Sequence, residues 1–261
     1  MALPKSDLAE LRRAKALLEN PGIAAKLSSL VGSPVERGLK MLPAKVRSGV
    51  HRATEAALMK ALDVAVTSLG IGTGARPSRD RLHKIAAAAS GAAGGALGLA
   101  ALTWELPIST TLMLRSIADI AAAEGENPRH IETKLACLTV FALGSTRSDR
   151  DDAAESGYFA ARAALASAVS EAAKHLAEKG LSKGGAPALV RLVSLIGARF
   201  GIVVSEKAAA QAVPILGAAG GALINTIFIG HYQDMARGHF IVRRLEKIHG
   251  AEPVKLAYEK L

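Results

Sequence analysis

A seven-residue stretch of glycine, alanine and leucine occurs twice in this chain with identical letters, at residues 91–97 and 217–223. Each copy lies inside a long segment that has no formal charge, residues 85–104 and 208–230. A glycine inside a helix costs roughly 1 kcal/mol relative to alanine, so such runs are typical of places where another backbone or a flat ligand comes very close. The repeat therefore predicts two smooth-faced helices that form a pair.

The spacing of the glycines predicts the surface along which these helices are smooth. Gly91, Gly95 and Gly98 fall at i, i+4 and i+7, and Gly217 and Gly221 fall at i and i+4, so each set shares one helical face. The predicted apolar lining comprises Gly91, Gly95, Gly98, Gly217, Gly221 and Asn225. A polar residue, Glu105 or His231, lies eight positions past each copy, so we expect each smooth face to end at a polar rim.

The composition predicts an all-α fold, a multi-helix bundle around the two Gly/Ala-rich apolar helices. Half of the 261 residues are apolar, but aromatic residues make up only 3%, so windows typical of strands are scarce. The single cysteine, Cys137, lies in an apolar stretch and has no partner for an internal disulfide. We expect it to be a small buried side chain in a protein of a reducing compartment.

Prolines and glycines predict the boundaries of the helices. A long amphipathic helix is expected from Pro43 to about Leu69, and the glycines of residues 70–74 resemble a linker. The linker predicts N-terminal amphipathic helices over 1–72 and a helical core over 73–261, unless the two form one continuous domain. Pro107 is expected to end the first Gly/Ala helix or to begin the next one, and two helices are expected to lead to Pro214, in the first turn of the second Gly/Ala helix.

The charge of the chain favours an anionic partner. The formal net charge is +10, and basic residues cluster at 37–52, 76–84, 174–207 and 237–247. No aromatic or Gly-Arg interleaving and no reading helix accompany them, so we do not expect nucleic-acid binding. Anionic lipid head groups attract such clusters by about 1 kcal/mol per basic residue near the surface. A membrane surface is therefore the preferred partner.

The two uncharged segments are long enough to span a membrane, but their content argues against a permanent anchor. Residues 85–104 contain nine alanines and four glycines and only four large aliphatic side chains. Those four contribute only about −2 kcal/mol to insertion, and the second segment about −4 kcal/mol before its polar residues are counted. A soluble or peripheral bundle is expected, with reversible insertion and true spanning as alternatives.

The first polar candidate is the stretch that follows the first Gly/Ala segment. Thr111, Arg115 and Asp119 are spaced i, i+4 and i+8 and share a helical face with apolar neighbours. One interpretation is a structural ion pair between Arg115 and Asp119. The other is a site for an anion or a lipid head group, with Arg115 as a forked donor and the hydroxyls of Thr110 and Thr111 beside it.

The second polar candidate follows the second Gly/Ala copy. His231, Asp234 and His239 span about 140° of a helix, which is wide for one metal ion held from a single helix. Glu105 or Asp119 from the other polar segment would be needed to complete such a site. A lipid head group meeting the 231–237 region, Arg237 included, and plain polar packing between helices are the alternatives; no metal and no cofactor is predicted.

The usual motifs of enzymes are missing from the sequence. The glycine clusters have no following Lys-Ser/Thr and no preceding strand, so they match neither a phosphate-binding loop nor a dinucleotide fingerprint. There is no Gly-x-Ser-x-Gly elbow and no His-Glu-x-x-His helix. The sequence therefore gives no reaction.

Several segments together resemble the bacterial EcsC family. They are residues 105–119, 213–225, 231–240 and 243–246, and with the first Gly/Ala copy the resemblance covers roughly residues 45–250. The family takes its name from a gene beside an ABC transporter, and some members are labelled peptidase-like. The resemblance implies a bacterial, cytosolic, membrane-linked helical protein.

The leading hypothesis is a non-enzymatic, membrane-associated protein that binds lipid or another long apolar ligand, in the cytoplasm and peripheral to the inner membrane. One alternative is a metal-dependent, peptidase-like hydrolase with Glu105, Asp119, His231, Asp234 and His239 around one cavity. Another alternative is a scaffold for an ABC transporter or an envelope complex, whose small-residue faces bind a membrane protein partner.

Overall fold

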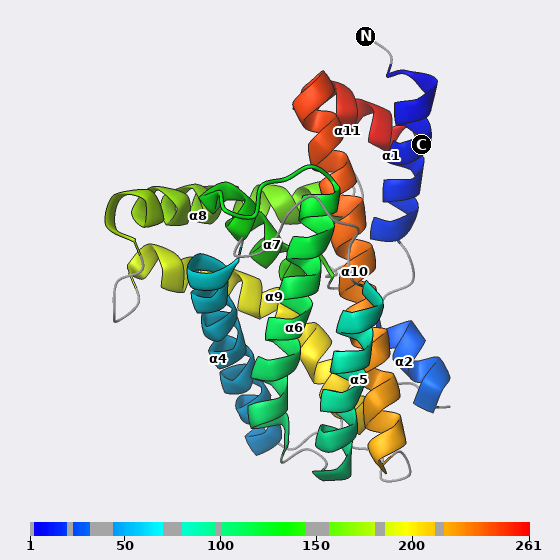
Figure 1. Ribbon diagram of the computed structural model, residues 1–261, viewed down its shortest axis with the longest axis vertical. Helices are drawn as coiled ribbons and strands as arrows, with labels where there is room; N and C mark the ends of the chain where they lie inside the picture. Colours follow the sequence, from blue (N-terminus) through cyan, green and yellow to red (C-terminus); the bar gives the residue numbers. More distant parts are fainter. Residues whose placement is uncertain are drawn as a thin grey trace.

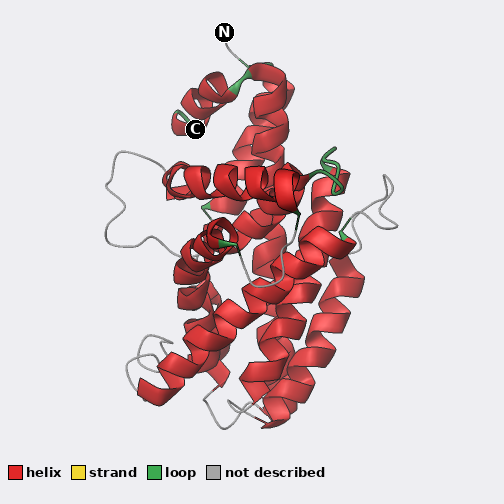
Figure 2. Cartoon of the chain, turned by 90° about the vertical axis from the view of Figure 1, so that its left-hand side faces the viewer, coloured by secondary structure: helices red, strands yellow, loops and turns green. Residues whose placement is uncertain are grey.

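The computed structural model describes residues 3–19, 23–31, 44–69, 80–97, 101–144, 157–180, 186–211 and 217–261. Every regular element in these ranges is a helix, as Figure 2 shows, so the predicted all-α class is confirmed. The helices are α1 (Lys5–Leu18), α2 (Ile23–Val31), α4 (Ala44–Ser68), α5 (Asp80–Leu97), α6 (Leu102–Ala123), α7 (Ile131–Leu143), α8 (Gly157–Lys179), α9 (Pro187–Gln211), α10 (Gly217–His249) and α11 (Ala251–Glu259).

The longest helices define the long axis of the molecule. Helices α4, α6, α5 and α10 run side by side along this axis, and α7, α8 and α9 pack together on one side of it (Figure 1). Helices α1 and α11 pack at the end of α10 where both chain termini lie, opposite to the end at which α10 begins (Figure 1). The Gly/Ala helices α5 and α10 form the most extensive helix pair, as a bundle built around them requires.

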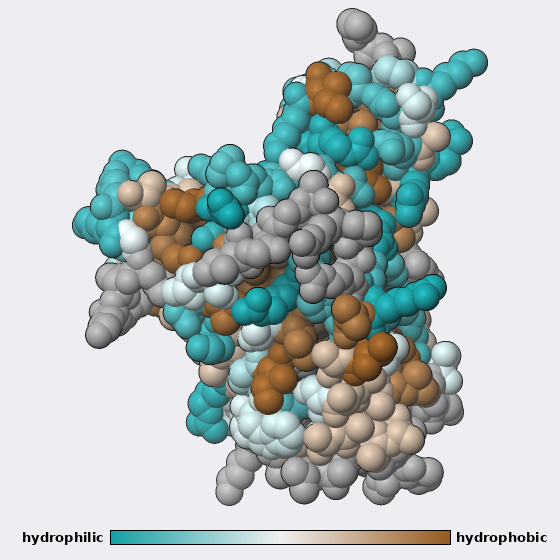
Figure 3. All heavy atoms as spheres, viewed as in Figure 1, coloured by the Kyte–Doolittle hydropathy of each residue, from teal (hydrophilic) through white to brown (hydrophobic). Residues whose placement is uncertain are grey.

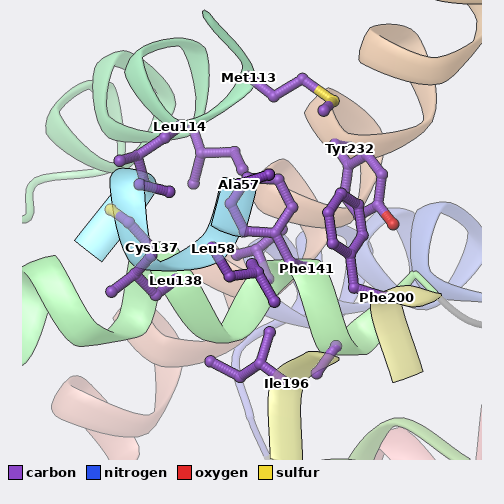
Figure 4. Close-up of a cluster of buried hydrophobic side chains, with 14 of the residues drawn as sticks. Ala57, Leu58, Met113, Leu114, Cys137, Leu138, Phe141, Ile196, Phe200 and Tyr232 are labelled. Carbon is purple, nitrogen blue, oxygen red and sulfur yellow. The ribbon is translucent and has the colours of Figure 1, made fainter. Parts of the chain in front are cut away.

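The main core lies where α4, α6, α7, α9 and α10 meet, and Figure 4 shows part of it. The rings of Phe141 and Phe200 pack with their centroids 5.0 Å apart, and the Phe141 and Tyr232 centroids are 5.3 Å apart. Cys137 is fully buried in the same cluster, as predicted, and burial raises the pKa of its thiol. An inert, packed thiol is the result.

Helix α4 contributes to this core. Ala57, Leu58 and Leu62 of α4 are buried in the cluster that contains Phe141 and Phe200. Helix α1 also packs on α10, where a Cβ atom on Gly238 would lie 2.6 Å from Leu18 Cγ. The described helices of 1–72 and 73–261 therefore share buried surface, and the division into domains stays a prediction.

Two predicted boundaries differ from the structure. Helix α5 ends at Leu97 and α6 begins at Leu102, so Pro107 lies inside α6 and neither ends the first helix nor begins the next. Between Pro187 and Gln211 one helix, α9, replaces the two that were predicted, because its long buried face outweighs the cost of its interior glycines. Pro214 and the linker at 70–74 lie outside the described residues.

Candidate functional site

The two Gly/Ala helices close on each other at a glycine. A Cβ atom on Gly91 of α5 would lie 2.3 Å from the carbonyl oxygen of Gly221 and 2.7 Å from Asn225 Cβ, both on α10. No side chain larger than hydrogen fits into that space. The predicted pairing of the two copies is therefore confirmed, and the helix faces are in direct contact here, with no room between them for a ligand.

The second glycine of α5 that makes a close contact is Gly94. A Cβ atom there would lie 2.9 Å from Glu105 Cγ on α6. Gly95 and Gly217 lie within α5 and α10, but their surroundings fall outside the described residues, as does Gly98 itself. The two closely packed glycines of α5 are thus three residues apart. Gly91 contacts α10, whereas Gly94 contacts α6.

At this crossing, a buried ion pair joins α6 to α9. The Nζ atom of Lys207 donates to both carboxylate oxygens of Glu105, at 3.0 and 2.8 Å, and the two side chains are 0% and 1% exposed. The Lys207 ammonium also lies 4.9 Å from the centroid of the Phe228 ring of α10. The predicted polar rim at Glu105 is wrong: the carboxylate lies inside the bundle, between the glycine face of α5 and the lysine.

Asn225 extends this pair to the two Gly/Ala helices. Its Nδ2 atom donates to Glu105 Oε1 at 2.7 Å and to the carbonyl oxygen of Ala87 at 3.0 Å, and the side chain is buried. The two amide protons thus link α10 to α6 and to α5. We call Glu105, Lys207 and Asn225 the buried polar cluster; its three side chains tie together four helices.

The physical cost of this cluster explains its geometry. Moving two charges out of water costs several kcal/mol each, and the attraction between them compensates only when the geometry is close and the remaining protons and lone pairs are used. Here the carboxylate accepts three hydrogen bonds, from two different side chains. The cluster is electrically neutral as a whole, and one of its polar atoms, Asn225 Oδ1, is buried without a hydrogen-bond partner among the described residues.

Sequence reasoning missed Lys207. It was grouped with the basic residues of 174–207, which were expected on the surface. A usable signal was present, however: Glu206 and Lys207 stand alone between two apolar runs of α9. Lysine and glutamate are almost never fully buried unless they are paired, so burial at such a position requires a partner. Glu206 is buried too. The burial of the Tyr232 phenol, together with the charge of Glu206, raises the pKa of Tyr232.

The structure does not bring Thr111, Arg115 and Asp119 together as one site. Asp119 pairs with His83 of α5, 3.0 Å from Nε2, and Arg115 is exposed and donates to Ser68 Oγ at 3.2 Å. The Thr111 hydroxyl donates to the Pro107 carbonyl, and Thr110 is buried. The expected Arg115–Asp119 pair is wrong, because a neighbouring helix supplies a better-placed partner for the aspartate.

The polar residues after the second copy also have separate partners. His231 Nε2 donates to the Gly144 carbonyl oxygen at 2.8 Å, which caps the end of α7, and burial lowers the pKa of His231 to about 4. His239 Nδ1 lies 2.9 Å from the Tyr158 hydroxyl. Asp234 pairs with Lys26 of α2, and Arg237 pairs with Asp80 of α5.

The five residues of the hydrolase hypothesis are therefore dispersed. Glu105, Asp119, His231, Asp234 and His239 are all described, and each contacts a different partner. No group of three or more His, Cys, Asp or Glu side chains with the spacing of metal ligands occurs among the described residues. The described residues therefore provide no set of metal ligands for the hydrolase hypothesis.

One described helix, α9, is long and apolar enough to cross a membrane by length and composition alone. It packs against α4, α7 and α8, and 44% of its most apolar window is buried within the protein. A core helix passes the same test, so α9 carries no argument for a span.

Taken together, the fold and the cluster define an all-helical bundle protein with a neutral, buried polar centre beside two tightly packed Gly/Ala helices. The family model described as the EcsC protein family matches residues 72–245, more than half of the chain. The chain therefore belongs to the EcsC protein family, and the resemblance seen in its motifs is confirmed. Comparisons with curated proteins and with solved structures find no match.

Proposed function

We propose that this protein is a non-enzymatic helical protein that attaches reversibly to an anionic membrane surface. The observation that carries the proposal is a large region of the bundle without free charge. It comprises residues 85–97, 102–114, 207–211 and 217–230, and its only charged side chains are Glu105 and Lys207. Both of these are buried and paired with each other. We call this part of the molecule the uncharged region.

The contrast with the rest of the chain supports the proposal. The protein has 33 lysines and arginines and 23 aspartates and glutamates, yet the described segments that make up the uncharged region contain only the buried pair of Glu105 and Lys207. Figure 3 shows the same division: hydrophobic spheres gather over the lower part of α5 and α6, and hydrophilic spheres cover the end that carries α1 and α11. A surface divided in this way is typical of proteins that dock on membranes or on other apolar partners.

The contact between the Gly/Ala helices favours docking over storage of a lipid inside the bundle. A ligand tunnel between α5 and α10 would need space at Gly91, where the backbone of Gly221 already lies. The exposed apolar side chains, in contrast, are available on the outside. The proposal therefore keeps a lipid partner but moves the contact from the interior to the surface.

Flotation with vesicles tests the proposal. Purified protein is mixed with phosphatidylcholine vesicles, with and without phosphatidylglycerol, and centrifuged through a density gradient. We expect flotation with the anionic vesicles and much less with the neutral ones, because basic residues add about 1 kcal/mol each near an anionic surface. High salt is expected to weaken binding by screening these charges.

Two results would overturn the proposal. One is protein that stays at the bottom of the gradient with both kinds of vesicle. The other is binding to native membranes but not to protein-free vesicles, which would indicate a membrane protein partner such as the transporter of the scaffold hypothesis.

A further inference from the structure

The face of the uncharged region that would meet the membrane can be identified from exposure and charge. Among the described residues, four of the exposed large apolar side chains lie on the neighbouring helices α5 and α6, and the others are distributed over α4, α9, α10 and α11. Leu82 and Ile85 of α5 are 60% and 67% exposed, and Trp104 and Ile108 of α6 are 39% and 46% exposed.

These side chains form two parallel stripes. On α5, Leu82 and Ile85 are followed by the exposed Ala89 and Ala93, at spacings of three and four residues that keep them on one helical face. On α6, Trp104 and Ile108 are four residues apart and the half-buried Leu112 continues the line. Each stripe runs along its helix, and the one on α5 is about 16 Å long at 1.5 Å per residue.

Contacts between the two helices set the stripes side by side. Helices α5 and α6 are antiparallel, since Gly94 meets Glu105 at one end and His83 pairs with Asp119 at the other. Figure 3 shows hydrophobic side chains on the front of the molecule over both α5 and α6. We call this surface, made of Leu82, Ile85, Ala89, Ala93, Trp104, Ile108 and Leu112, the α5–α6 face.

The exposed charges on α5 and α6 beside the α5–α6 face are basic. The three carboxylates of these helices are less exposed and have partners: Asp80 pairs with Arg237, Glu105 pairs with Lys207, and Asp119 shares a hydrogen bond with His83. Arg81 and Arg115, in contrast, are exposed next to the stripes. The only tryptophan, Trp104, stands at the opposite end, and tryptophan favours the interface between acyl chains and head groups.

We propose that the protein lies side-on on anionic phospholipid, with the α5–α6 face in the outer acyl region and Arg81 and Arg115 at the phosphates. This inference rests on the proposed function and specifies its contact surface. The alternative within the same function is end-on insertion of the part of the bundle where α5 and α9 end and α6 and α10 begin. Side-on docking needs both stripes along their length, whereas end-on insertion does not use Ile85 or Leu82.

Four substitutions test the orientation. Ile85→Glu and Ile108→Glu place a charge on the α5–α6 face. Leu223→Glu is the matched control, because Leu223 has the same 46% exposure as Ile108 and lies in the uncharged region. It points away from the side of α10 that contacts α5, since it is about 160–200° around the helix from Asn225 and Gly221. Leu256→Glu, on α11, controls for an exposed leucine at the far end of the molecule.

The expected result is a loss of binding to anionic vesicles by about tenfold or more for each of the two face variants, with little change for the two controls. Circular dichroism melts check that all four variants fold, which is expected because the substituted positions are exposed. Face variants that float like the wild type, or an equal loss in Leu223→Glu, would overturn side-on docking while leaving membrane attachment in place. Wild-type protein that fails to float contradicts the proposed function and this inference together.

Discussion

At the scale of single residues, Glu105 and Lys207 are the side chains on whose pairing the stability of the bundle depends most. Their charges are buried at the crossing of α5, α6, α9 and α10, and Asn225 joins them to both Gly/Ala helices. Removing one partner of a buried pair leaves the other charge uncompensated, which typically costs about 3–5 kcal/mol. A pair exposed to water is worth about 1 kcal/mol or less.

A double-mutant cycle measures this coupling. We expect Lys207→Met or Glu105→Gln alone to lower the free energy of unfolding by about 3–5 kcal/mol, and the double variant to lose much less than the sum. Chemical denaturation provides the measurement. Lys60→Met is the control, because the Lys60–Asp63 pair is exposed, and it is expected to cost about 1 kcal/mol or less. Single variants as mild as this control would contradict a tightly coupled buried pair.

His231, a buried histidine of α10, makes the free energy of unfolding depend on pH. The pKa of His231 is about 4 in the folded protein, below its ordinary value of 6.5, because burial disfavours the charged ring. The unfolded chain therefore takes up this proton first as pH falls from 6.5 to 4, and stability decreases by up to about 3 kcal/mol over that window.

Comparison of wild type with His231→Gln isolates the effect. The difference in free energy of unfolding between the two proteins should shrink as pH is lowered from 6.5 towards 4, because only the wild type loses stability through this group. His51→Gln, at an exposed histidine, serves as the control for replacing a histidine with glutamine. A constant difference across the window would show that His231 does not titrate as its burial requires.

Sequence patterns identified some of these residues but not their partners. Glu105 was singled out by its place after the first Gly/Ala copy, whereas Lys207 lies 102 positions away and was missed. The pair Arg115 and Asp119 was predicted from helical spacing, but His83 of α5 competes for the aspartate. Spacing along one helix reports local neighbours, and the choice among partners from different helices depends on packing that the sequence pattern does not contain.

At the scale of elements, the contact of α5 with α10 decides how the bundle closes. Gly91 lets two backbones meet, and Gly94 makes room for the Glu105 side chain. The duplicated Gly/Ala stretch made this pair predictable, because few other reasons exist for so many glycines inside helices. The position of Pro107 inside α6 and the unbroken α9 were not predictable in the same way, since buried faces can override the local preferences of glycine and proline.

Alanine substitutions at glycines test this contact. Gly91→Ala is expected to destabilise the protein by about 1–3 kcal/mol or more, because the new methyl group would overlap Gly221 and Asn225. Gly201→Ala in α9 is the matched control: nothing lies within 4 Å of its Cβ position, so the change should be neutral or stabilising by up to about 1 kcal/mol. Thermal melts compare the two. Equal effects would mean that α5 and α10 do not meet at Gly91.

At the scale of the whole molecule, the distribution of charge is the main finding. The uncharged region lies at one part of the bundle, its own two charges are buried together, and exposed arginines border the α5–α6 face. The all-α class was predictable from composition, and the net charge is what favours an anionic surface in our proposal. The face itself was not predictable, because it depends on which sides of α5 and α6 the other helices leave uncovered.

The fluorescence of Trp104 tests the central claim most directly, since it is the only tryptophan of the chain and lies on the α5–α6 face, 39% exposed. Anionic vesicles with bromine-labelled acyl chains are titrated into the wild-type protein. With side-on docking we expect the emission to shift to shorter wavelength and to be strongly quenched by the labelled chains. Both effects should be weaker in Ile108→Glu. Emission that stays unchanged and unquenched while the protein co-floats with the vesicles would contradict it.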